Sequence, residues 1–231
     1  MSASTWSEQT QYLNGPAGLI EVRLGQHSDS VIKNGIIMCH PHPLFSGTMD
    51  NKVVTTLVRG ASRLLIEPTV ANNSQGEHSK LDTLRFNFRG VGQSEGEHDN
   101  GQGEQDDLAT VVNYAIEELG WQKIYLAGFS FGAGVTCLYA NAHPEKVAGL
   151  FLIAPAVHHF DAPMTLPFDF ETHVYMGDAD EVVPFDEVEH WVDLVIPQPH
   201  WRVFEDAGHF FHGRLVELKN TVLQDLTDII S

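Results

Sequence analysis

The sequence is short of positive charge and of cysteine. It has 13 Lys and Arg against 31 Asp and Glu, which gives a formal net charge of −18 with neutral histidines. A surface of this sign repels phosphate backbones and anionic lipids, and no basic run compensates, so nucleic-acid binding is excluded as the main function. The two cysteines, Cys39 and Cys137, are too few for a disulfide framework and lie among apolar residues, as buried free thiols do.

Long hydrophobic runs are also missing. No stretch reaches the roughly 18 continuous apolar residues of a transmembrane helix. Residues 1–11 are polar and carry no apolar core of a signal peptide. We therefore expect no membrane association and a cytoplasmic location. With 231 residues, 42% of them hydrophobic, the chain is long enough to bury a large core.

Strand-like and helix-like segments alternate along the chain. Apolar runs of strand length lie at 18–24, 35–39, 84–88, 124–127, 147–153, 172–176 and 201–204. Apolar residues recur at helical spacing in 51–67, 104–119, 131–142 and 215–230. This order predicts an α/β fold, with a mostly parallel sheet covered by helices on both faces. No linker or repeat divides the chain, so we expect one domain over 1–231, with its core at roughly 15–230.

A serine stands at one strand-to-helix turn, in the motif Gly128-Phe129-Ser130-Phe131-Gly132. Glycines before and after the serine permit a sharp turn that projects its hydroxyl from the carboxyl end of the strand. The N-terminus of the following helix, with the Phe131 N–H, is suited to stabilise an oxyanion. This context favours a nucleophile, although a serine that only caps the helix remains the alternative.

A serine nucleophile needs a base, and the base needs an orienting acid. Asp178 and Asp180 follow the strand 172–176, and Asp206, His209 and His212 follow the strand 201–204. Parallel strands end at the same edge of a sheet, so these side chains face the edge from which the serine emerges. Asp206 is only three residues before His209, which makes it a poorer orienting partner than the first two aspartates.

Several further motifs accompany the serine along the chain. The full set is His40-Pro41-His42-Pro43, Gly47-Thr48-Met49-Asp50-Asn51-Lys52, Arg85-Phe86-Asn87-Phe88-Arg89-Gly90-Val91-Gly92-Gln93-Ser94, Gly128 to Gly132, Gly177 to Pro184 and Gly208-His209-Phe210-Phe211-His212-Gly213. Taken together, these motifs resemble those of the α/β-hydrolase superfamily, in its branch of small, lidless bacterial serine hydrolases. The resemblance covers roughly residues 15–225 and implies Ser130 as nucleophile, Asp180 as acid and His209 as base. The segment 69–80 is polar, longer than the usual connection in such proteins, and expected at the amino-terminal edge of the sheet.

The second oxyanion donor should be a backbone N–H in the loop after the strand 35–39. Proline has no N–H, which excludes Pro41 and Pro43. We predict that His42 donates beside Phe131, with Leu44 as the alternative. The prolines would stiffen this loop and so preorganise the donor.

Only about 18 residues, 154–171, separate two predicted strands at the place where this fold usually carries a cap domain. They are too few for a substantial cap, so we expect a covering loop and an open site. Leu44, Phe45, Phe160 and Met164 are predicted to line a pocket for an acyl group, with ordinary packing of a surface loop as the alternative.

Metal and cofactor chemistry are not expected. His40, His42 and the pair His158-His159 suggest a metal site, but no carboxylate joins them at typical spacing. Gly90-Val91-Gly92 follows a strand, yet Glu95 stands where a dinucleotide-binding loop has its third glycine.

These observations predict a carboxylesterase that uses Ser130, His209 and Asp180 on a small-molecule ester. A thioesterase or a peptidase-like hydrolase on the same residues is one alternative, because the same chemistry cleaves those bonds. A catalytically silent binding protein with this fold is another. The sequence does not identify the natural substrate or the oligomeric state.

Overall fold

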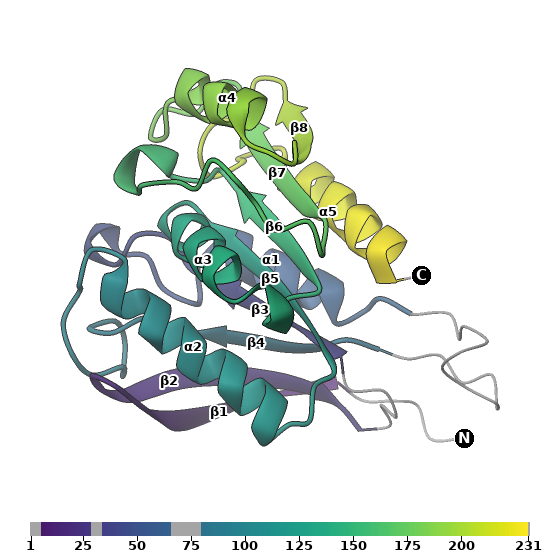
Figure 1. The fold of residues 1–231 in the computed structure, drawn as a ribbon. Coiled ribbons are helices and arrows are strands. Elements are labelled where there is room, and N and C mark those ends of the chain that lie inside the picture. The colour runs from purple at the N-terminus through teal and green to yellow at the C-terminus, as the bar shows by residue number, and fades with distance from the viewer. Residues whose placement is uncertain (1–5, 29–33, 66–79, 231) are drawn as a thin grey trace.

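The computed structural model describes residues 6–28, 34–65 and 80–230, which contain one eight-stranded sheet (Figure 1). The strand order is β1-β2-β4-β3-β5-β6-β7-β8. β2 pairs antiparallel with β1 and β4, and every ladder from β4 to β8 is parallel, which confirms the predicted mostly parallel α/β sheet. The strands are β1 (Trp6–Gly15), β2 (Gly18–His27), β3 (Asn34–Cys39), β4 (Asp82–Phe86), β5 (Lys123–Phe129), β6 (Gly149–Ile153), β7 (Thr172–Gly177) and β8 (His200–Phe204).

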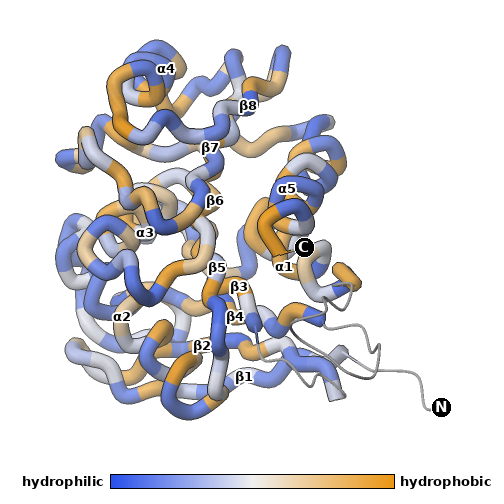
Figure 2. The backbone as a smooth tube through the Cα atoms, turned by 45° about the vertical axis from the view of Figure 1, so that its right-hand side comes forward, coloured by the Kyte–Doolittle hydropathy of each residue, from blue (hydrophilic) through white to orange (hydrophobic). Residues whose placement is uncertain are grey.

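Helices cover both faces of this sheet. α2 and α3 pack together on one face, and α1 and α5 pack together on the other, with the strands between the two pairs (Figure 2). Every residue of β3, β4, β6 and β7 is buried, as apolar strands covered on both faces should be. The helices are α1 (Lys52–Ala61), α2 (Gln102–Glu117), α3 (Phe131–Ala142), α4 (Phe185–Leu194) and α5 (Leu215–Ile230), and the 3-10 turns are η1 (Pro43–Phe45), η2 (Pro144–Lys146) and η3 (Val157–His159).

Two elements are absent from the sequence prediction. β1 is a polar edge strand whose residues are exposed or only half-buried, so it lacks the apolar run by which we identified the other strands. α4 buries only Val188, Trp191 and Val192 in an otherwise acidic segment. Both elements lie at the periphery of the sheet, where a weaker apolar pattern is enough.

One helix boundary was predicted wrongly. α1 ends at Ala61, whereas apolar spacing suggested a helix over 51–67. Leu64, which extended that spacing, packs on the core from a turn instead. The polar segment predicted at 69–80 lies, up to residue 79, outside the described residues.

The parallel strands bring four loops to one edge of the sheet. β3 leads into His40, β5 into Ser130, β7 into Asp180 and β8 into His209. Ligand sites of open α/β sheets lie at this carboxyl edge. Among the helices that the structure describes, none has the length and hydropathy needed to cross a membrane.

Candidate functional site

Ser130 stands at a sharp turn between β5 and α3. Its backbone has φ 58° and ψ −117°, a region that residues with a Cβ rarely adopt. The flanking glycines make the turn possible: a Cβ on Gly132 would lie 2.5 Å from the His40 carbonyl oxygen, and one on Gly128 would collide with the Gly132 carbonyl. The Ser130 N–H donates to the Ile153 carbonyl at the end of β6 over 2.8 Å, which fixes the turn to the sheet.

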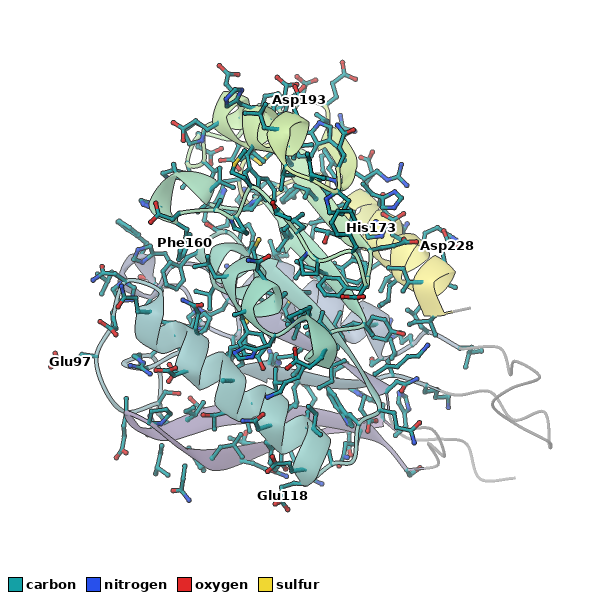
Figure 3. The ribbon with its side chains drawn as sticks, viewed as in Figure 1. Glu97, Glu118, Phe160, His173, Asp193 and Asp228 are labelled. Carbon is teal, nitrogen blue, oxygen red and sulfur yellow. The ribbon has the colours of Figure 1, made fainter. Side chains whose placement is uncertain are left out.

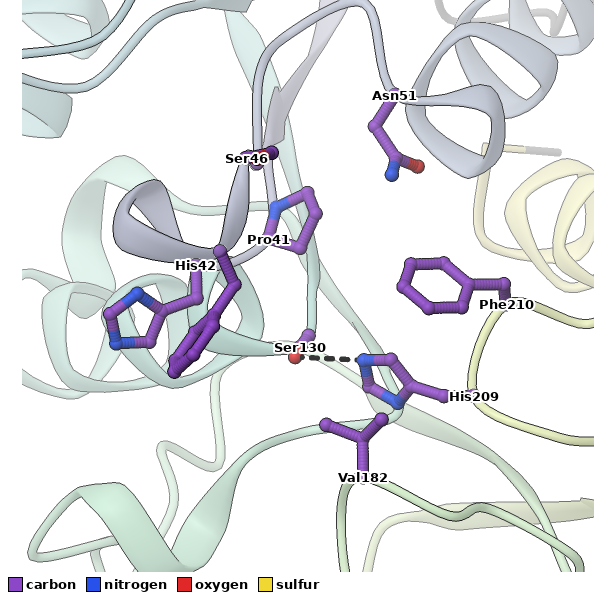
Figure 4. Close-up of a pocket in the computed structure, with 10 residues that line it drawn as sticks. Pro41, His42, Ser46, Asn51, Ser130, Val182, His209 and Phe210 are labelled. Atoms are coloured by element: carbon purple, nitrogen blue, oxygen red, sulfur yellow. Dashed lines mark hydrogen bonds between the residues drawn. The ribbon is translucent and has the colours of Figure 1, made fainter.

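The Ser130 hydroxyl faces an imidazole that is oriented by a carboxylate. His209 Nε2 lies 3.1 Å from Ser130 Oγ (Figure 4). On the other side of the ring, His209 Nδ1 lies 2.8 Å from Asp180 Oδ2. The Asp180 side chain is fully buried, and its other oxygen accepts the N–H groups of Val182 and Val183, each at 2.8 Å. These donors orient the carboxylate toward His209, so that it can accept a hydrogen bond from Nδ1 and leave Nε2 to accept a proton from the serine.

The rival residues occupy other positions. Asp178 accepts the Asp206 N–H at 2.7 Å and so joins the loops after β7 and β8. His212 is exposed, and its ring lies against Phe210. Of the acids and histidines that the sequence left open, Asp180 and His209 are the pair that hydrogen-bonds in line with Ser130.

Two backbone N–H groups beside Ser130 are unengaged. Among the described residues, neither the Phe131 N–H, in the first turn of α3, nor the His42 N–H has a hydrogen-bond acceptor. The alternative donor, the Leu44 N–H, is directed to His42 Nδ1 at 3.2 Å. His42 and Ser130 line the same cavity. Both N–H groups are therefore available to an oxyanion, and the assignment of His42 and Phe131 as its donors stays a prediction.

His40 anchors the loop that carries His42. Its buried ring accepts the Phe88 N–H on Nε2 at 3.0 Å, so Nδ1 carries the proton that is donated to the Pro41 carbonyl at 2.6 Å. Burial lowers the pKa of His40 to about 4, so the ring stays neutral at neutral pH. It joins the ends of β3 and β4 and holds no position from which to act on Ser130.

A cavity of about 300 Å³ opens over Ser130. Figure 4 shows Val182 and Phe210 on opposite sides of the His209 ring. The lining is largely apolar, and Ser46 and Asn51 add polar side chains to those of Ser130 and the two histidines. The residues that line the cavity are Pro41, His42, Phe45, Ser46, Gly47, Asn51, Ser130, Val182, His209 and Phe210.

The predicted lining is corrected at three of its four positions. Phe45 lines the cavity, but Leu44 is 70% exposed beside it. The Phe160 ring packs against Phe131, its centroid 5.4 Å away, and occupies the space that a Cβ on Gly134 would need. Met164 is about half exposed and is absent from the lining, and its carbonyl accepts the Ile196 N–H. The loop 154–171 therefore packs beside α3 instead of forming a wall of the cavity.

The histidines considered for a metal site do not form one near Ser130. The rings of His158 and His159 are tilted toward each other with their centroids 4.0 Å apart, and the His159 centroid lies 6.1 Å from that of His42. Among the described residues these rings bring no three ligand atoms together. Proton transfer through His209, and not a metal-bound water, is the chemistry that the arrangement supports.

The sequence matches the family model of the alpha/beta hydrolase fold over residues 68–172. An uncharacterized protein of Rickettsia prowazekii is 31% identical over 228 residues, which make up 95% of this chain and 89% of the relative. The chain belongs to the α/β-hydrolase superfamily. Among solved structures, an alpha-beta serine hydrolase homologue from Coxiella burnetii is 38% identical and superposes with a TM-score of 0.81 over 94% of this chain and 97% of that chain.

Within the superfamily, the chain falls in the lidless branch of serine hydrolases. A Xanthomonas campestris protein described as an α/β serine hydrolase without a lid is 32% identical, with a TM-score of 0.79 over 94% of this chain and 93% of the other. The observed loop between β6 and β7, residues 154–171, holds only the single turn η3, as the sequence predicted for a hydrolase without a cap.

One residue beside the site was missed by the sequence analysis. The Glu181 carboxylate accepts the His209 N–H at 3.0 Å, and it lies 2.7 Å from where a Cβ on Gly208 would stand. Glu181 thus fixes the backbone on the N-terminal side of the histidine's Cα. Nothing in the pattern distinguishes it from its acidic neighbours Asp178 and Asp180, because the contact depends on how two loops meet.

Proposed function

We propose that this chain is a carboxylesterase that cleaves small-molecule esters with small or medium acyl groups through an acyl-enzyme on Ser130. The observation that carries the proposal is the line of hydrogen bonds from Asp180 through His209 to Ser130. A hydroxyl, an imidazole and a buried carboxylate in this order make a nucleophile from a serine.

The reaction proceeds in two steps. In the first, His209 takes the Ser130 proton as Oγ attacks the ester carbonyl, Asp180 stabilises the imidazolium, and His209 then protonates the leaving alcohol. In the second, His209 activates a water that releases the acid. The His42 and Phe131 N–H groups stabilise the oxyanion in both steps, and each such donor contributes about 3 kcal/mol to a typical acyl transfer. No metal or cofactor takes part.

The cavity supports the choice of substrate class. Its volume of about 300 Å³ is at the lower end of the range typical of ligand sites. Phe45, Val182 and Phe210 offer apolar contact to an acyl chain but are exposed, at 80%, 53% and 40%. The net charge of −18 disfavours anionic substrates. A neutral ester with a short acyl chain fits these conditions.

A fluorophosphonate probe and a series of p-nitrophenyl esters of increasing chain length test the proposal. We expect labelling that is lost in Ser130→Ala and turnover that is greatest for short or medium chains. Labelling that survives Ser130→Ala would refute the nucleophile. Faster turnover of acyl-thioesters or aminoacyl-arylamides would reassign the substrate to the thioesterase or peptidase-like class, and a chain that reacts with no serine probe would be a silent binding protein.

Neighbouring residues provide matched controls. His209→Ala and Asp180→Asn should lower kcat/KM by several orders of magnitude, because the base or its orientation is lost. His212→Ala and Asp178→Asn change the same residue types in the same loops, and they should retain most of the activity. Equal losses in both pairs would show that the loops, and not the hydrogen-bonded line, were disturbed.

A further inference from the structure

Three potential metal ligands converge at the edge of the sheet opposite Ser130. Glu171 directly precedes β7, His173 lies near the start of β7, and His200 is the first residue of β8. Glu171 Oε2 is 3.3 Å from His173 Nε2 and 3.5 Å from His200 Nε2. No other group of three His, Cys, Asp or Glu side chains among the described residues brings its ligand atoms this close.

Strand geometry explains why the three side chains meet. Glu171, directly before β7, and His173, its second residue, are two positions apart along the chain, the spacing at which side chains of an extended segment point to the same face. His200 pairs with His173 in the β7–β8 ladder, and the two rings stack at 4.4 Å. Phe151 of β6 stacks on the other side of His173 at 5.3 Å, which fixes that ring. His200 is the adjustable member, because its side chain is 53% exposed.

A buried carboxylate stands behind His173. The His173 ring lies beside α5 (Figure 3), and its Nδ1 is 3.5 Å from Oδ2 of the buried Asp225 carboxylate. Asp225 is held by the Tyr175 hydroxyl at 2.8 Å and by Arg202 at 3.0 Å. His173 Nδ1 makes no hydrogen bond among the described residues, although the Asp225 carboxylate stands 3.5 Å away, and Nε2 faces Glu171 at 3.3 Å. A carboxylate behind the ring is typical of metal-bound histidines in proteins.

We propose that Glu171, His173 and His200 form a binding site for a divalent transition-metal ion of the zinc type. Ligand atoms about 2.05 Å from a tetrahedral zinc lie about 3.3 Å apart, close to the two separations from Glu171. At 3.3 Å the hydrogen bond between Glu171 and His173 is long, because N–H···O bonds are most often about 2.9–3.0 Å. The exposed His200 ring turns out of its stack to direct Nε2 at the ion, and water completes the coordination.

The site is accessible, and its position indicates its role. Glu171 and His200 line an open cavity of about 340 Å³ through which an ion and its water enter. The ligands lie at the amino ends of β7 and β8, whereas Ser130 is at the carboxyl edge. The ion therefore does not touch the ester. It links β8, an edge strand, to β7, and so stabilises the element that leads into His209.

Calorimetric titration of the chelator-treated protein with ZnCl₂ tests this proposal. We expect one ion per chain and a rise in the urea midpoint of unfolding, because an ion that binds only the folded state stabilises it. His200→Ala and Glu171→Gln should each raise the Kd for zinc by about tenfold or more. Loss of a residue that only supports a metal ligand already has an effect of about this size, and loss of the ligand itself should cost no less. Because the His200 side chain is exposed, its replacement by alanine tests the site without disturbing the fold.

Two matched controls separate this site from general attraction to an acidic protein. His190→Ala and Glu189→Gln change exposed residues of α4 by the same substitutions and should leave Kd and the midpoint shift unchanged. His159→Ala tests the histidines near the catalytic edge and should also have no effect. Absence of zinc binding, or binding that His200→Ala and Glu171→Gln leave intact, would overturn the proposal.

Discussion

The strained backbone of Ser130 can be measured with two substitutions. Its φ of 58° and ψ of −117° suit glycine far better than any residue with a Cβ. Ser130→Ala keeps the Cβ, and Ser130→Gly removes it. Both variants lose the hydroxyl that faces His209 Nε2. The difference in stability between them therefore reports the backbone alone.

The expected difference follows from two opposing effects. Holding a non-glycine residue in this region costs about 1–3 kcal/mol. Glycine removes that strain but loses about 0.5–1 kcal/mol more conformational entropy on folding than alanine does. We expect Ser130→Gly to be more stable than Ser130→Ala by about 1 kcal/mol. In a chain of this length, that is a rise of about 2–4 °C in Tm.

Urea unfolding followed by circular dichroism measures this difference. Ser62 supplies the control pair, because it is buried with an ordinary φ of −62°. There we expect the opposite order, with Ser62→Gly less stable than Ser62→Ala by about 0.5–1 kcal/mol. If Ser130→Gly unfolds at the same urea concentration as Ser130→Ala or below it, the turn stores no strain and the reasoning fails.

Three further predictions concern the residues around this turn. Gly132→Ala should abolish fluorophosphonate labelling and lower the free energy of unfolding by about 1–3 kcal/mol or more, because the new Cβ meets the His40 carbonyl at 2.5 Å; normal labelling would contradict this. The free energy of unfolding should fall as the pH drops from about 6.5 to 4, since His40 takes up a proton in the unfolded chain before its folded pKa of about 4 is reached. In urea titrations across this pH range, the free energy of unfolding of His40→Asn should fall by up to about 3 kcal/mol less than that of the unmodified protein. Equal dependence on pH in the two proteins would refute the prediction. Glu181→Ala should lower kcat about 2- to 10-fold through the lost hydrogen bond to the His209 N–H, and Glu181→Gln, which keeps an acceptor, should restore it; a variant series with equal rates would exclude the contact from catalysis.

The sequence was informative wherever function depends on backbone. The alternation of strands and helices predicted the parallel sheet, and a parallel sheet brings the ends of its strands to one edge. Ser130 follows β5 directly, and Asp180 and His209 lie in the loops after β7 and β8, so their meeting at that edge follows from strand order. The glycines at 128 and 132 marked the turn because no other residue fits there.

The sequence was uninformative where contacts depend on how loops pack. Phe160 and Phe45 are alike in type and loop context, yet only Phe45 faces the cavity. What separates them is the space above Gly134, which the Phe160 ring fills. Glu181 and Asp178 are acidic residues of the same loop, and the sequence does not say which backbone N–H each accepts. In the structure, Glu181 accepts that of His209 and Asp178 that of Asp206. Such choices are made by tertiary packing, which residue spacing does not encode.

The absence of a lid changes how water is excluded from the site. Ser130 and His209 are only 6% and 2% exposed, whereas the cavity walls Phe45 and Val182 are 80% and 53% exposed. The protein thus buries the groups that transfer protons and leaves the apolar walls in water. An acyl chain that binds there covers Phe45 and Val182, and each Å² of apolar surface removed from water stabilises the complex by about 25 cal/mol. In the proposed mechanism the substrate itself completes the dry environment that strengthens the oxyanion hydrogen bonds, as a cap would in a larger relative.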